Sequence, residues 1–125
     1  MVVVDTCGWI EWLTEGELAS EFQPWLIKPE SLLVPSSVQF ELYKWVKRER
    51  GEPLALEVVG WTEQARVLPL DTNIALLAAD MALQHRLSFA DAIIYASACR
   101  HNAKLVTLDD HFEGLPGVIY FDKRN

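Results

Sequence analysis

Four acidic residues stand where predicted strands end or predicted helices begin, and they are the side chains of this sequence most suited to act together: Asp5, Glu41, Asp91 and Asp109. Carboxylates that approach within several ångströms repel one another and resist full ionisation unless cations lie between them. Oxygen-only ligand sets select hard ions such as Mg²⁺ or Mn²⁺. Convergence of these acids would therefore indicate a divalent metal site.

Two of the acids follow predicted strands, and two lie in the first two turns of predicted helices. Asp5 and Asp109 come directly after short apolar runs, Glu41 lies in the second turn after the capping signal at Ser36, and Asp91 lies in the first turn after Ser88. Each has a simpler explanation taken singly, as a helix cap or as part of a solvated face. Capping alone does not require four acids from separate segments to face one end of one sheet.

The segments that must position these acids alternate between strand and helix patterns. Strands are predicted over 2–4, 31–34, 66–70, 104–108 and 118–121, and helices over 6–13, 14–25, 36–50, 53–64, from 71 or 72 onward, and 88–102, with a helical turn at 109–112. Such alternation predicts a three-layer α/β/α sandwich with a mainly parallel sheet. Ligands bind such sheets beyond the carboxyl ends of the strands, where the acids are expected.

Length and composition indicate one cytoplasmic domain over 1–125. Half of the residues are hydrophobic, no apolar run approaches the length of a membrane span, and the start of the chain does not resemble a signal peptide. Cys7 and Cys99 are expected to be buried thiols in apolar surroundings. The net charge of −7 argues against a nucleic-acid binder, unless several of the acids hold cations.

Four segments, in this order, resemble the motifs of the PIN domain family, and most closely its virulence-associated protein C (VapC) toxins. They are VVVDT at 2–6, PSSVQFEL at 35–42, LSFADAII at 87–94 and LVTLDDHF at 105–112. Each motif is weak alone, but the ordered set spans nearly the whole chain. The sequence departs from the family at Leu108 and Asp110, where basic or polar residues are frequent.

The resemblance implies a Mg²⁺- or Mn²⁺-dependent endoribonuclease that leaves 5′-phosphate and 3′-hydroxyl ends. Carried over, Asp5, Glu41, Asp91 and Asp109 are the catalytic acids, with Asp5, Asp91 and Asp109 as metal ligands. Thr107 matches a hydroxyl that lies near the metal in the family, and Asp110 is a candidate neighbour of the metal site. The resemblance further implies a homodimer, held inactive by a cognate antitoxin protein.

Lys44 and Arg48 follow Glu41 by three and seven residues, so they share its helix face and are candidate contacts to RNA phosphates. His111 lies two residues after Asp109 and is expected to be a surface residue, though within reach of substrate. Five tryptophans on predicted helices are expected in the core or at a partner surface: Trp9, Trp12, Trp25, Trp45 and Trp61.

Two other functions remain open at this stage. A phosphatase of the haloacid dehalogenase type needs a second Asp two residues after its nucleophile, but Thr6 and Cys7 follow Asp5. The other function is that of a catalytically inactive PIN-like module for RNA binding or assembly. The presence of all four acids argues against it. The RNA target, the number of metal ions and the dimer interface are not specified by the sequence.

Overall fold

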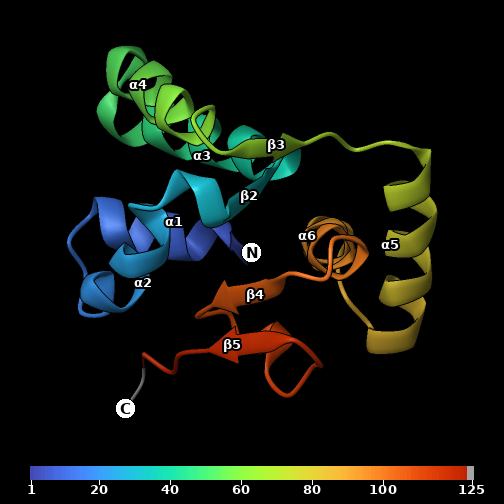
Figure 1. The fold of residues 1–125 in the computed structure, drawn as a ribbon. Coiled ribbons are helices and arrows are strands. Elements are labelled where there is room, and N and C mark those ends of the chain that lie inside the picture. Colours follow the sequence, from blue (N-terminus) through green and yellow to red (C-terminus); the bar gives the residue numbers. More distant parts are fainter. Residues whose placement is uncertain (124–125) are drawn as a thin grey trace.

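The computed structural model describes residues 1–123 and is built around a five-stranded sheet (Figure 1). The strands are β1 Val2–Val4, β2 Leu32–Pro35, β3 Arg66–Leu68, β4 Lys104–Thr107 and β5 Val118–Tyr120. Their order is β3-β2-β1-β4-β5, and every neighbouring pair is parallel. The predicted parallel α/β architecture is therefore confirmed.

Helices cover both faces of the sheet and give the predicted three layers. They are α1 Thr6–Leu13, α2 Ala19–Leu26, α3 Ser36–Arg50, α4 Glu52–Thr62, α5 Thr72–His85 and α6 Phe89–Arg100, with the 3₁₀ turns η1 Pro29–Ser31 and η2 Asp110–Phe112. Figure 1 shows α5 and α6 on one side of the sheet and α1 and α2 on the other. Helices α3 and α4 form an antiparallel pair beside β2 and β3.

The central strands are buried on both faces, which explains their continuous apolar sequence. Val3, Val4, Leu105 and Val106 are at most 1% exposed. Trp9, Phe22 and Phe112 are the largest fully buried side chains and fill the space between sheet and helices. None of the helices within residues 1–123 combines the length and apolar character that a bilayer crossing requires.

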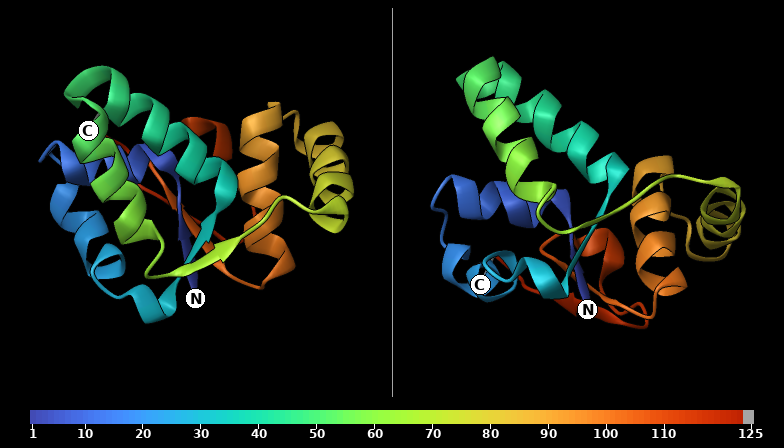
Figure 2. Two further views of the ribbon diagram at one scale, coloured as in Figure 1. Left: turned by 90° about the horizontal axis from the view of Figure 1, so that it is seen from above. Right: turned by 45° about the horizontal axis from the view of Figure 1, so that its top comes forward.

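The pairing of β1 with β4 sets the position of the predicted site. Val4 is in register with Val106, and the backbone N–H of Asp5 donates to the carbonyl of Val106 at 2.9 Å. Asp5 and Thr107 therefore lie side by side where the two strands end. Helices α3 and α6 lie next to each other beside this edge (Figure 2).

The prediction that a helix begins at Thr14 is wrong. Thr14 instead ends α1, where its Oγ1 donates to the carbonyl of Ile10 at 2.8 Å, and α2 begins only at Ala19. The hydroxyl is satisfied by the helix before it, so the capping-box spacing from Thr14 to Glu17 is coincidental. Smaller shifts occur at the strand ends, since β2 begins after Ser31 and β3 ends at Leu68.

Glu11 organises the turn that replaces the predicted helix start. Its carboxylate is buried and accepts hydrogen bonds from the backbone N–H of Leu18 at 2.9 Å and from Nζ of Lys123 at 2.7 Å. Gly16 packs directly against this carboxylate, where a Cβ would collide with it. Burial acts to raise the pKa of Glu11, but the bonds from Lys123 and Leu18 outweigh it and lower the pKa.

We predict that Glu11→Gln lowers the free energy of unfolding by about 2 kcal/mol at neutral pH, because a hydrogen-bonded charge is lost. The folded-state pKa of Glu11 is lowered, so its contribution is full above the unfolded-state pKa and disappears as the pH falls through the folded value. Urea unfolding across this range measures the difference. The exposed Glu21→Gln is the matched control, and equal stability of the two variants at pH 7 would contradict the prediction.

Candidate functional site

Asp5 and Thr107 form the buried floor of the site. Asp5 is 4% exposed and Thr107 is fully buried. Thr107 Oγ1 donates to Asp5 Oδ2 at 2.8 Å and accepts from the backbone N–H of Asp109 at 2.9 Å. Asp5 also caps α1, since its Oδ1 accepts from the N–H of Thr6 at 2.8 Å. Thr107 thereby ties the end of β1 to the start of η2.

Burial raises the pKa of Asp5 from 3.8 to about 6, and the charge of Asp91 acts in the same direction. The hydrogen bonds from Thr107, Cys7 and the backbone of Thr6 oppose this rise. The carboxyl group of Asp5 is therefore difficult to ionise, and a positive charge at the site would favour its ionised form.

Cys7 is a residue whose environment the sequence did not reveal. Its thiol donates to Asp5 Oδ2 at 3.4 Å and lies 3.4 Å from Thr107 Oγ1, so the expectation of apolar surroundings is wrong for Cys7. Burial, followed by the charge of Asp5, raises the pKa of this thiol far above its usual range. Cys7 is therefore a neutral donor that helps to fix the orientation of the Asp5 carboxylate.

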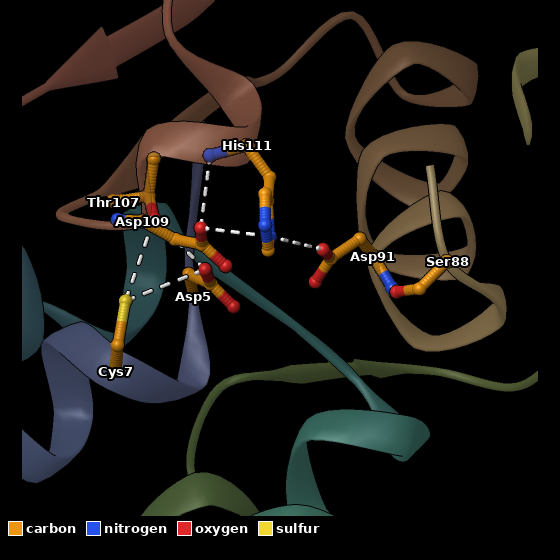
Figure 3. Close-up of polar contacts among 7 residues, drawn as sticks. All are labelled: Asp5, Cys7, Ser88, Asp91, Thr107, Asp109 and His111. Atoms are coloured by element: carbon orange, nitrogen blue, oxygen red, sulfur yellow. Dashed lines mark hydrogen bonds and ion pairs between the residues drawn. The ribbon is translucent and has the colours of Figure 1, made fainter. Parts of the chain in front are cut away.

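Asp91, Asp109 and His111 form a compact group at the mouth of the site (Figure 3). One potential ligand atom from each lies within 4.8 Å of the others. His111 Nδ1 is 3.3 Å from Asp91 Oδ2 and 3.1 Å from Asp109 Oδ1. The two carboxylates raise the pKa of His111, and burial with the charge of Asp109 raises that of Asp91.

The group is assembled by local structure at two helix starts. Ser88 caps α6 by accepting from the N–H of Asp91 at 3.3 Å, which holds Asp91 in the first turn of the helix. Asp109 caps η2 by accepting from the N–H of His111 at 2.9 Å. The caps formed by Ser88 and Asp109 therefore coexist with the approach of Asp91 to Asp109. Figure 3 shows the carboxylates of Asp5, Asp91 and Asp109 turned toward one shared space.

Glu41 reaches the same edge of the sheet from α3. Its Oε1 accepts a hydrogen bond from Thr6 Oγ1 at 2.7 Å, and Thr6 is the residue next to Asp5. A cavity of about 270 Å³ beside it is lined by Thr6, Ile10, Phe40, Glu41, Lys44, Trp45 and Arg48. The predicted sharing of one helix face by Glu41, Lys44 and Arg48 thus produces a shared cavity.

The structure gathers two of the four predicted acids, Asp91 and Asp109, into one tight set with His111. Among residues 1–123, Asp5 and Glu41 lie outside the three-residue group within 4.8 Å, and Asp110 is an exposed neighbour rather than a member. His111 is exposed as expected, at 70% of its side chain, yet it bridges two predicted metal ligands. Its spacing from Asp109 was the only sequence signal for that role.

These donors fit a divalent cation on chemical grounds. Two carboxylates and an imidazole within 4.8 Å are common ligands of first-row divalent ions. Each Asp5 carboxylate oxygen has two acceptor sites. Oδ2 already accepts from Thr107 and Cys7, whereas Oδ1 accepts from Thr6 and keeps one site with which to coordinate an ion. Burial is the main cause of the raised pKa values of Asp5 and Asp91, and a cation would favour the ionised form of both carboxyl groups.

Comparison with known proteins agrees with this arrangement. The sequence model of the PIN domain family matches residues 2–118. No curated protein sequence matches the chain.

Solved structures with the same fold cover nearly the whole chain. A toxin–antitoxin complex from Klebsiella pneumoniae superposes with a TM-score of 0.78 at 23% identity, covering 95% of this chain and 96% of that one. VapC20 of Mycobacterium tuberculosis, a toxin that cleaves the sarcin–ricin loop, superposes with a TM-score of 0.75 at 18% identity. The match covers 94% of this chain and 97% of that one. DNA-bound VapBC from Salmonella typhimurium superposes with a TM-score of 0.71 at 21% identity, and the match covers 96% of each chain.

We predict that Thr107→Val raises the pKa of Asp5 above its value of about 6, because a hydrogen bond to the ionised form is removed. Carboxyl-carbon NMR titration in the presence of a chelator measures this directly. Thr72→Val, at an exposed threonine that begins α5, is the control and should leave the titration unchanged. An unchanged Asp5 titration in Thr107→Val would show that this bond does not tune the carboxylate.

Proposed function

Because this chain belongs to the PIN domain family, we propose that it is a Mg²⁺- or Mn²⁺-dependent endoribonuclease and the toxin of a toxin–antitoxin pair. The observation that supports the proposal is the close group of Asp91 and Asp109 with His111, toward which the buried carboxylate of Asp5 is turned at the end of β1 (Figure 3). A buried acid with a raised pKa beside further carboxylates is typical of a functional site.

In this proposal Asp5, Asp91 and Asp109 hold the metal, and His111 lies in position to add a nitrogen ligand. When bound, the ion polarises the phosphodiester and lowers the pKa of an attacking water. Thr107 and Cys7 keep the Asp5 carboxylate oriented, and Thr6 does the same for Glu41. No side chain is required as a covalent nucleophile.

The energetics of Asp5 favour cation binding. A rise in its folded-state pKa from 3.8 to about 6 means that the ionised carboxylate costs about 3 kcal/mol of stability above pH 6. The cost begins as the pH rises through the unfolded value of 3.8 and is complete above the folded value. A divalent cation at this edge would remove much of it by favouring the ionised form.

Substrate binding is assigned to the cavity on α3. Lys44 and Arg48 line it together with Glu41, so positive charge lies beside the acids. Lys44 Nζ lies 5.8 Å from the centre of the Phe40 ring, and the Arg48 side chain is 60% exposed. Both cations are accessible to an RNA backbone, and the exposed Phe40 ring offers a surface for base stacking.

A protein antitoxin, a homodimeric state and a cytoplasmic location complete the proposal. The similar structures include complexes of toxins with antitoxins from Klebsiella pneumoniae and Salmonella typhimurium. Trp12 and Trp61 stack edge to face at 6.2 Å and line a cavity of about 300 Å³ between α1, α2 and α4. Trp61 is 37% exposed, which suits an aromatic anchor for a partner protein.

We predict that Asp5→Asn abolishes RNA cleavage and weakens Mn²⁺ binding, because the buried ligand loses its charge. Wild-type cleavage should stop on addition of a chelator and return with Mg²⁺ or Mn²⁺. Cleavage of a labelled RNA and calorimetric titration with Mn²⁺ measure the two effects. Asp80→Asn, an exposed acid on α5, is the matched control. Full cleavage by Asp5→Asn, or cleavage insensitive to chelator, would overturn the proposed metal mechanism.

We predict that Lys44→Glu with Arg48→Glu raises the KM for RNA and lowers the dependence of binding on salt, because contacts to phosphates are lost. For single-stranded RNA the slope of log K against log salt falls by about 0.7 per lost contact. The control is Lys47→Glu with Arg50→Glu, which makes the same charge change on the same helix. Equal KM values and slopes for the two double variants would refute the assignment.

A further inference from the structure

A second cavity, of about 430 Å³, lies away from the acids, between the edge strand β3, the start of α5 and the end of α6. Three of its lining side chains are basic or can become so: Arg66 on β3, Arg100 at the end of α6, and His101 just after it. Asn73, in the first turn of α5, and Asp71, which caps that helix, complete its polar wall.

This cavity is separate from the acidic site because α6 spans the distance between them. Asp91 lies in the first turn of α6, next to Asp109 at the carboxyl end of β4. Arg100 ends the same helix, twelve residues long, and β4 begins shortly afterwards at Lys104. At 1.5 Å per residue the helix is about 18 Å long, so its Arg100 end, which lines the cavity, lies far from Asp91.

The two arginines have no acidic partner that would explain their position. Within residues 1–123, no ion pair or hydrogen bond involves the guanidinium of Arg66 or Arg100. The nearby Asp71 carboxylate accepts from the N–H of Ile74 at 2.9 Å and keeps its negative charge. In a protein of net charge −7, the two exposed arginines outnumber the single carboxylate of Asp71 in this cavity, which gives it a net positive charge.

The donors of the cavity are suited to a phosphate group. A guanidinium donates two parallel hydrogen bonds to phosphate oxygens, and arginine remains charged at any physiological pH. Asn73, in the first turn of α5, adds an amide donor. The volume lies within the usual range for sites that hold a small molecule.

We propose that this basic cavity, defined by Arg66, Asn73, Arg100 and His101, binds a phosphate group carried by a nucleotide or by an RNA strand. The site is distinct from the metal-ligating edge and does not depend on the chain being a nuclease. If the ligand is RNA, the cavity holds a backbone phosphate far from the acids. If it is a free nucleotide, the cavity is a separate small-molecule site.

The test compares wild type with the double variant Arg66→Gln and Arg100→Gln. The control, Lys28→Gln with Arg86→Gln, removes the same charge at exposed positions elsewhere. Binding of inorganic phosphate, 5′-AMP and a short single-stranded RNA is measured by calorimetry in the presence of a chelator, so that no metal-bound phosphate contributes. Circular dichroism verifies the fold of each variant. A second measurement needs no variant: phosphate should shift the amide NMR signals of Asn73 and His101 in wild type.

The proposal expects about a tenfold or greater loss of affinity in the double variant and none in the control. Loss for 5′-AMP alone identifies a nucleotide site. Loss for RNA, with a salt slope reduced by about 0.7 per lost contact, identifies a backbone site. Equal binding by both double variants, or no shift of Asn73 and His101 at millimolar phosphate, would overturn it. Neither outcome affects the proposed nuclease activity, because no measurement involves cleavage.

Discussion

The parallel pairing of β1 with β4 is the constraint on which the candidate site depends. It places Asp5 beside Thr107, residues separated by about a hundred positions in sequence, and it directs the chain from Thr107 into Asp109. Neither strand would be stable alone, since each is only three or four residues long and lacks hydrogen bonds without its neighbours. The helix caps orient the acids locally, and the pairing of the strands brings Asp5 and Asp109 to the same edge of the sheet.

Burial of acids at this edge opposes the stability of the fold. Desolvation is the largest contribution to the raised pKa values of Asp5 and Asp91, and the two charges also raise each other's energy. Thr107 and Cys7 donate to one carboxylate, whereas His111 lies between Asp91 and Asp109. The arrangement offsets the repulsion only in part, which is the condition in which a cation binds most favourably.

Local sequence signals misled where tertiary contacts supplied a different partner. The Thr14 hydroxyl could have capped a following helix, but it donates to the carbonyl of Ile10 in the preceding one. The turn that follows Thr14 is organised instead by the buried carboxylate of Glu11, which accepts from the N–H of Leu18. Cys7 on α1 resembled an apolar core residue, yet its thiol lies beside the hydroxyl of Thr107 at the end of β4. His111 is exposed, as most histidines near turns are, but the turn η2 directs its ring toward Asp91.

The sequence by itself determined the parallel α/β class, the capped helix start at Ser88 and the family, because hydrophobic periodicity, capping residues and motif order are local properties of the chain. The cap expected at Ser36 is wrong: α3 begins at Ser36, but Pro35 holds the cap position and no side chain caps the helix. Only the tertiary structure decided which acids meet. It placed Asp91 and Asp109 in a tight group with His111, left Glu41 joined to Asp5 through Thr6, and gathered Arg66 with Arg100. Distances between side chains on different elements depend on strand register and helix packing, and no local pattern encodes them.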